Sequence, residues 1–99
     1  MAHGLANALI LPHAMRFNRP AVGDAAATVG AILGHPEDPA AGCEALRERL
    51  GLPTGLSDCG VSEDDVEAVV RLSQSSPAVG SNPRPVSEAD ARAILEAAW

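Results

Sequence analysis

Apolar residues recur at intervals of three and four along most of this chain, and strict alternation of apolar and polar residues is nearly absent. The first spacing places apolar side chains on one face of an α-helix, whereas a half-exposed β-strand needs the second. We therefore predict an all-α fold. The expected architecture is an irregular bundle of about five helices, over roughly 4–17, 21–33, 39–50, 63–74 and 88–99.

Capping residues mark the ends of these predicted helices. Ser62 and Ser87 each stand three residues before an aspartate, which is the pattern of a capping box. Asp38 precedes a proline, and proline is tolerated in the first turn of a helix. Gly34 and Gly51 follow the second and third helices, where glycine commonly ends a helix. The segments 51–60 and 73–86 are then connectors.

The same spacing predicts which side chains face the core. The third helix is expected to direct Glu44, Arg47 and Glu48 outward. The predicted inner residues are Val22, Ala25, Ala26, Val29, Ile32 and Leu33 in the second helix, Ala41, Ala45, Leu46 and Leu50 in the third, Val66, Val69 and Val70 in the fourth, and Ala91, Ile94, Leu95 and Ala98 in the last.

Composition limits the kind of domain that these helices can build. The chain has 99 residues, which suits one domain at most, and Phe17 and Trp99 are its only aromatic residues, so the core is expected to be shallow. Its 13 acidic residues against 7 arginines give a net charge of −6, which argues against a nucleic-acid partner.

Features of membrane and secreted proteins are also missing from the sequence. The longest apolar run, 8–11, is far shorter than the roughly 20 residues that span a bilayer. The first residues lack the basic region of a secretory signal. Cys43 and Cys59 form no CxxC pair, so we expect both to be reduced thiols in a cytoplasmic protein.

The opening stretch HGLANALILPHAMRFN, at 3–18, has no clean polar face, so we expect a central helix with protein on most sides. Pro12 is expected to bend it. His3 and His13 are ten residues apart, about 15 Å along a helix and about 80° apart in direction, so they cannot share one ion. The residues alone favour a polar helix-start role for His3, a neutral, hydrogen-bonded imidazole for His13 and a solvated turn position for His35.

No self-sufficient active site is visible in the sequence, so we predict no catalytic and no nucleotide-binding residue. Gly51, Gly55 and Gly60 are scattered turn glycines without the strand and helix of a dinucleotide fingerprint. The acidic run 63–65 is read as a helix cap rather than a cation site. Cys59 has no basic residue within a few positions that would favour a reactive thiolate.

Three blocks of sequence occur together in a recognisable order: the opening stretch, then LGLPTGLSDCGVSEDDVEAVV at 50–70, then NPRPVSEADARAILEAAW at 82–99. In this order they resemble the C-terminal helical domain of the iron-containing (group III) alcohol dehydrogenase family. The resemblance implies a second, Rossmann-like domain that binds NAD or NADP, and a divalent metal, Fe²⁺ or Zn²⁺, at the cleft between the domains. The implied reaction is metal-assisted hydride transfer between an alcohol or carbonyl and nicotinamide.

The histidine of the family's His-Gly pair is a metal ligand, and it matches His3, so the resemblance overturns the reading from the residues alone. The family's other ligands, an aspartate and two histidines, lie upstream in its pattern and have no match here, and Ala2 stands where the family usually has proline. We therefore expect residues 1–99 to form part of a metal-site domain whose nucleotide-binding domain is absent. On this view Met1 stands inside the parent domain, and the chain is a fragment that is inactive and binds neither cofactor stably alone.

Two alternatives remain open at this point. The short middle segment, 18–50, the Asn-Pro-Arg-Pro sequence and the Ala-Trp end also resemble maleylacetate reductases, although these tend not to carry the Gly-Leu-Ala-Asn sequence at 4–7. A different class of function is a stand-alone helical interaction module. The expected partner is accordingly either the missing domain or a second copy that meets the apolar helix 4–17.

Overall fold

A computed structural model describes residues 3–99 of the chain, so Met1 and Ala2, on which part of the sequence argument rests, lie outside the described residues. Its elements are α1 (His3–Val22), α2 (Asp24–Ile32), α3 (Pro39–Arg49), the 3₁₀ turn η1 (Leu56–Cys59), α4 (Glu63–Ser73), α5 (Pro77–Gly80) and α6 (Glu88–Ala98). Residues 3–99 contain no strand, so the all-α prediction is confirmed. The five expected helices are present, and the short α5 and η1 lie in the two expected connectors.

The first helix is longer than predicted. It continues through Pro12 and Pro20 to Val22, which removes two residues from the expected start of the second helix. Gly23 separates the two helices with a φ of +45°, in the left-handed region that glycine tolerates best. The predicted boundary at 17 was wrong, since the helix continues past the buried Pro12 and through the exposed Pro20.

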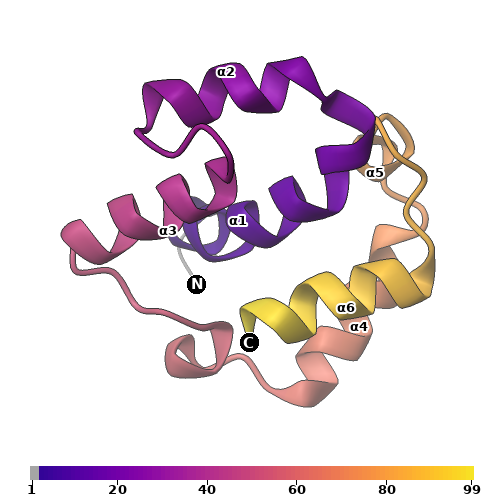
Figure 1. The fold of residues 1–99 in the computed structure, drawn as a ribbon. Helices are drawn as coiled ribbons and strands as arrows, with labels where there is room; N and C mark the ends of the chain where they lie inside the picture. Colours follow the sequence, from indigo (N-terminus) through magenta and orange to yellow (C-terminus); the bar gives the residue numbers. More distant parts are fainter. Residues whose placement is uncertain (1–2) are drawn as a thin grey trace.

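Helix α1 lies at the centre of the molecule, with α2 and α3 on one side and α6, backed by α4, on the other (Figure 1). Its central position confirms the prediction, whereas its expected burial on most sides was wrong. Only Leu9 and Pro12 are fully buried, and Leu11 is half exposed. The molecule is flat, 36 × 31 × 18 Å, so a helix in its middle still has a face open to solvent.

The apolar core lies where α1, α4, α6 and η1 meet. It consists of Leu9, Leu56, Val66, Val70, Ala91, Leu95 and Ala98. Both capping boxes form as predicted, because Ser62 and Ser87 each accept a hydrogen bond from the backbone N–H three residues on, at 3.1 Å. A paired ion contact from Arg92 to Glu67, at 2.7 and 2.9 Å, joins α6 to α4.

Glycines make the close contacts around α2 and α3, Gly30 with the turn after α2 and Gly42 of α3 with Leu33 at the end of α2. A Cβ atom on Gly30 would lie 2.4 Å from the carbonyl oxygen of His35, and one on Gly42 would lie 2.8 Å from Cβ of Leu33. These close approaches leave little room for large side chains at the contact. Gly34 and Gly51 have the positive φ values expected of glycines that end helices.

Several inner-face predictions are corrected by this packing. In α2, Ala26 is buried, but Ala25 and Val29 are exposed and Ile32 is 80% exposed. In α3 the prediction was wrong at Leu46 and at Leu50, just after the helix, which are exposed, and at Arg47, which was expected to point outward and is only 8% exposed. Ala41 and Ala45 are partly buried and Glu48 is exposed, in line with the prediction. In α4, Val66 and Val70 are buried as predicted, whereas Val69 is half exposed.

In α6, Ala91, Leu95 and Ala98 are buried as predicted, and Ile94 is partly buried. None of the helices within residues 3–99 is both long enough and apolar enough to cross a membrane.

Candidate functional site

His3, the predicted metal ligand, begins α1 and is exposed. Within residues 3–99, no group of three or more His, Cys, Asp and Glu side chains lies close enough together to hold a metal ion. A protein metal site of the zinc or iron type needs several such ligands around one ion. The described residues therefore do not make a metal site by themselves, and His3 fits such a site only as one ligand among groups from elsewhere.

The other two histidines lie apart from His3. His13 is half buried, and burial lowers its pKa, with smaller contributions in the same direction from Arg16 and Arg47 against an opposing one from Glu44. The lowered pKa favours the neutral imidazole that the sequence predicted, and the hydrogen bond expected for the ring stays a prediction. His35 is exposed in the turn after α2, as predicted.

Ionisable groups cluster where α1 meets α3. Arg16 donates a hydrogen bond to Glu44 and lies 3.6 Å from Asp38, and the contact with Arg16 lowers the pKa of Glu44. The Nε and Nη1 atoms of Arg47 are buried without a hydrogen-bond partner among residues 3–99. Because burying an unpaired charged group is costly, this is a strained point of the fold.

The two cysteines are free thiols, as predicted. The Cys43 thiol lies 3.5 Å from the sulfur of Met15, and burial, together with Glu44, raises the pKa of this thiol. A raised pKa disfavours the reactive thiolate. The acidic run 63–65 caps α4, and the hydrogen bond from the backbone of Ser62 lowers the pKa of Asp65, so its predicted role as a cap is confirmed.

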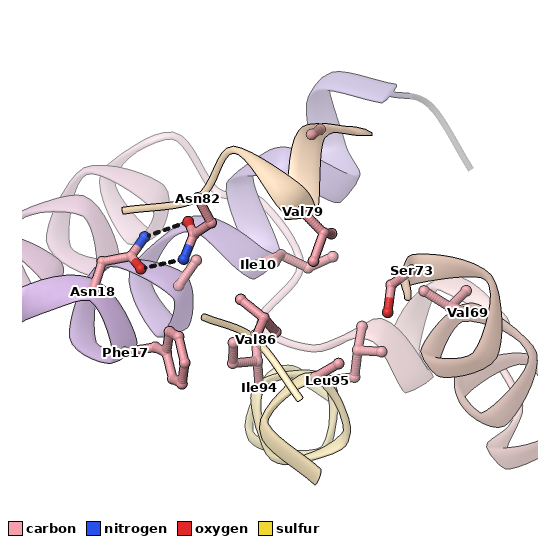
Figure 2. A pocket seen from close by; sticks show the side chains of 13 residues that line it. Ile10, Phe17, Asn18, Val69, Ser73, Val79, Asn82, Val86, Ile94 and Leu95 are labelled. Carbon is pink, nitrogen blue, oxygen red and sulfur yellow. Dashed lines mark hydrogen bonds between the residues drawn. The ribbon is translucent and has the colours of Figure 1, made fainter. Parts of the chain in front are cut away.

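An apolar pocket with a volume of about 300 Å³ lies between α1, α4, α5 and α6, and Figure 2 shows its side chains. Ile10 and Phe17 of α1 face Ile94 and Leu95 of α6, and Val79 of α5 lies beside Ile10. No ionisable side chain lines it. The pocket was not predicted from the sequence, because it is formed by residues from four separate segments.

A hydrogen-bonded latch closes one end of this pocket. The side-chain amides of Asn18 and Asn82 donate to each other at 3.0 and 2.7 Å, as the dashed lines in Figure 2 show. Asn82 also donates to the carbonyl oxygen of Arg84 at 2.7 Å, and Arg84 donates to the carbonyl oxygen of Phe17 at 2.7 Å. The Arg84 guanidinium lies 4.1 Å from the centre of the Phe17 ring, a cation–π contact.

The latch ties the segment 77–86 to the end of α1. It uses the last residue of the opening stretch and the Asn-Pro-Arg sequence at 82–84, two motifs that sequence analysis singled out without assigning them a structural role. An amide pair separated by 64 residues leaves no periodic signal in a single sequence.

Comparison with known proteins places the whole of this chain in one family. The model of the C-terminal part of the Fe-containing alcohol dehydrogenase family matches residues 1–99. The chain belongs to the iron-containing alcohol dehydrogenase family. The predicted resemblance is thereby confirmed, and with it the membership of an oxidoreductase family. No solved structure matches the chain.

Curated members of the family are similar over most of this chain. It is 31% identical to lactaldehyde reductase of Escherichia coli over 98% of its own length, which is 28% of the length of that protein. It is 38% identical to a maleylacetate reductase of Pseudomonas aeruginosa over 70% of its length, or 19% of that protein. It is also 30% identical to 1,3-propanediol dehydrogenase of Klebsiella pneumoniae over its full length, again 28% of the relative. The chain thus spans about a quarter of the relatives that it matches.

Proposed function

We propose that this chain acts as the helical, metal-site part of an NAD(P)-linked alcohol dehydrogenase, which transfers hydride between an alcohol or carbonyl and nicotinamide. The observation that carries the proposal is the family match over residues 1–99. The names of the relatives support the reaction class, since lactaldehyde reductase and 1,3-propanediol dehydrogenase are named for aldehyde and alcohol substrates.

His3 is the residue of this chain that we assign to the metal, Fe²⁺ or Zn²⁺. Its exposure at the first turn of α1 leaves the imidazole accessible to groups from outside residues 3–99. The remaining metal ligands would come from outside residues 3–99, and so would the nucleotide-binding domain. The chain is then inactive alone, and it binds neither a divalent metal nor NAD(P) stoichiometrically.

A chimera tests the proposal. This chain would replace the matched segment of Escherichia coli lactaldehyde reductase, and reduction of lactaldehyde with NADH or NADPH would be measured. We expect activity that His3→Ala abolishes and that His35→Ala, at another exposed histidine, leaves within about twofold of the parent. A folded chimera whose activity survives His3→Ala would contradict the assignment.

The maleylacetate reductase branch is the second candidate, and the higher identity to that relative over 70% of the chain favours it. The same segment exchange into that enzyme separates the two. The first proposal predicts the more active chimera with lactaldehyde reductase, and the second predicts the reverse.

A non-enzymatic role is the third candidate. The half-exposed Leu11 on α1 favours self-association through that helix. Sedimentation of the full chain would then show a dimer that Leu11→Ser dissociates. For all three candidates we propose that the protein is located in the cytoplasm, which the two free thiols support.

A further inference from the structure

Two sulfur atoms meet where α1 packs against α3. The Cys43 thiol of α3 donates a hydrogen bond to the sulfur of Met15 on α1, and the two sulfur atoms are 3.5 Å apart. Both side chains are partly buried. The pair does not include His3, and neither side chain has a part in the proposed hydride transfer. A ligand of this pair is therefore a question independent of the proposed function.

Sulfur ligands select particular metal ions. Thiolate and thioether sulfurs are soft donors that favour Cu(I), whereas Mg²⁺, Ca²⁺ and Mn²⁺ prefer oxygen. A structural zinc ion takes four ligands, and within residues 3–99 no group of three His, Cys, Asp and Glu side chains supplies such a set around Cys43. Cu(I) is stable with two or three sulfur ligands. The pair of Cys43 and Met15 therefore suits Cu(I) better than Zn²⁺.

The distance between the two sulfur atoms is compatible with one ion bound to both. With metal–sulfur bonds of about 2.3 Å, sulfurs 3.5 Å apart subtend an angle of about 100° at the metal. This bent arrangement leaves a further position on the ion open to water or to a small thiol. Because the sulfurs are already this close, α1 and α3 do not have to separate to bind the ion.

The sulfur of Met15 can be reached from the surface of the molecule. Its side chain lines two open hollows, one of about 250 Å³ with Arg16 and Asp38, and one of about 220 Å³ with Val22 and Val29. An ion can approach through either hollow while the contact between α1 and α3 stays in place.

Binding of Cu(I) exchanges one proton for one metal ion. Burial raises the pKa of the Cys43 thiol, so this thiol carries its proton when no metal is present. On binding, the S–H bond breaks, a bond between the thiolate and Cu(I) forms, and the proton passes to solvent. No atom changes its oxidation state. The thiolate and Cu⁺ are together neutral, so the partly buried site gains no net charge.

We propose that Cys43 and Met15 form a binding site for a soft monovalent cation, Cu(I), which links α3 to α1 through their two sulfur atoms. Cys59, the other free thiol, lies in η1 against the apolar core and provides the matched control.

The test titrates the full chain with Cu(I), kept reduced by ascorbate without oxygen, in competition with the coloured chelator bicinchoninate. We expect about one equivalent of Cu(I) for each chain, and a shift of the Met15 methyl signal by NMR as the ion is added. Zn²⁺ at the same concentrations should leave this signal unchanged. A Met15 methyl signal that does not respond to Cu(I) would overturn the proposal, because the thioether would then not be a ligand.

Three variants locate the site. Cys43→Ser should abolish binding in the competition, and Met15→Leu, a swap of similar volume that cores tolerate, should weaken it about tenfold or more. Cys59→Ser should change the affinity by less than about twofold. If Met15→Leu binds Cu(I) as tightly as the parent, or if Cys59→Ser loses as much affinity as Cys43→Ser, the contact between the two sulfurs is packing alone and the proposal is wrong.

Discussion

The pair α4 and α6 and the pair α2 and α3 are both short helix pairs against the central α1, but they are held in different ways. In the first pair, Val70 and Leu95 are buried, both helices begin with a complete capping box, and an ion pair joins them. In the second pair, Gly30 closely approaches the turn after α2, Gly42 of α3 closely approaches Leu33, and the Nε and Nη1 atoms of Arg47 are buried without a partner.

This difference is one between side-chain packing and close backbone approach. Packing of large side chains leaves an apolar stripe that can be read from the sequence, whereas backbone contact through glycine leaves none. The exposed Ile32 and Leu50 show that apolar residues in the second pair do not mark its contact face. Truncation of a single side chain should accordingly lower the free energy of unfolding more in the first pair than in the second.

The largest expected effect is that of a core truncation in the first pair. Leu95→Ala should lower the free energy of unfolding by about 2–5 kcal/mol, because Leu95 is buried in the core and its removal leaves a cavity. Leu50→Ala, at a leucine that is 64% exposed, should change it by less than about 0.5 kcal/mol. Denaturant unfolding measures both, and similar losses would break the comparison.

In the second pair the damaging change is the addition of an atom. Gly30→Ala should lower the free energy of unfolding by about 1–3 kcal/mol, because its Cβ would lie 2.4 Å from a backbone oxygen that cannot move independently. Gly4→Ala, at a helical glycine with open space around it, should stabilise the protein by up to about 1 kcal/mol. A stabilising Gly30→Ala would refute the close approach of α2 to the following turn.

Arg47 offers a test in the opposite direction, because replacing this buried side chain should not lower the free energy of unfolding. Arg47→Met should raise the free energy of unfolding by about 1 kcal/mol, because an apolar side chain of similar length relieves the unpaired Nε and Nη1 atoms. Arg49→Met, at an exposed position of the same helix, is the control and should change it by less than about 0.5 kcal/mol. A large loss in Arg47→Met would show that the guanidinium has a partner.

The smallest expected effect concerns pH. Burial lowers the pKa of His13 from its ordinary 6.5, so near that pH the folded chain binds fewer protons than the unfolded chain. The stabilising contribution is complete above pH 6.5 and is lost as the pH falls through the folded pKa. His13→Gln should remove this part of the pH dependence, while above pH 8 the two proteins should differ by a constant amount. An unchanged slope between pH 7 and 5 would contradict the lowered pKa.

The α4 and α6 pair could be predicted from the sequence better than the α2 and α3 pair. The helices, both capping boxes and the buried residues Val66, Val70 and Leu95 could be predicted, because each depends on local spacing and local hydrogen bonds. The burial of Arg47 and the exposure of Leu46 could not, since they depend on how α3 packs against α1 and α2.

The candidate sites also differ in how far the sequence could predict them. The match of His3 to the family pattern could be read from the motif, and His35 could be placed in an exposed turn. The pocket and its latch could not be foreseen, because Asn18 and Asn82 meet only after the bundle has formed.

The most direct test of the account is the metal content of the chimera with lactaldehyde reductase, measured by mass spectrometry after removal of loosely bound ions. The account predicts about one equivalent of divalent metal for each chain in the parent chimera and in His35→Ala, and loss of nearly all of it in His3→Ala. A folded His3→Ala chimera that retains its metal would contradict the assignment of His3 as a ligand.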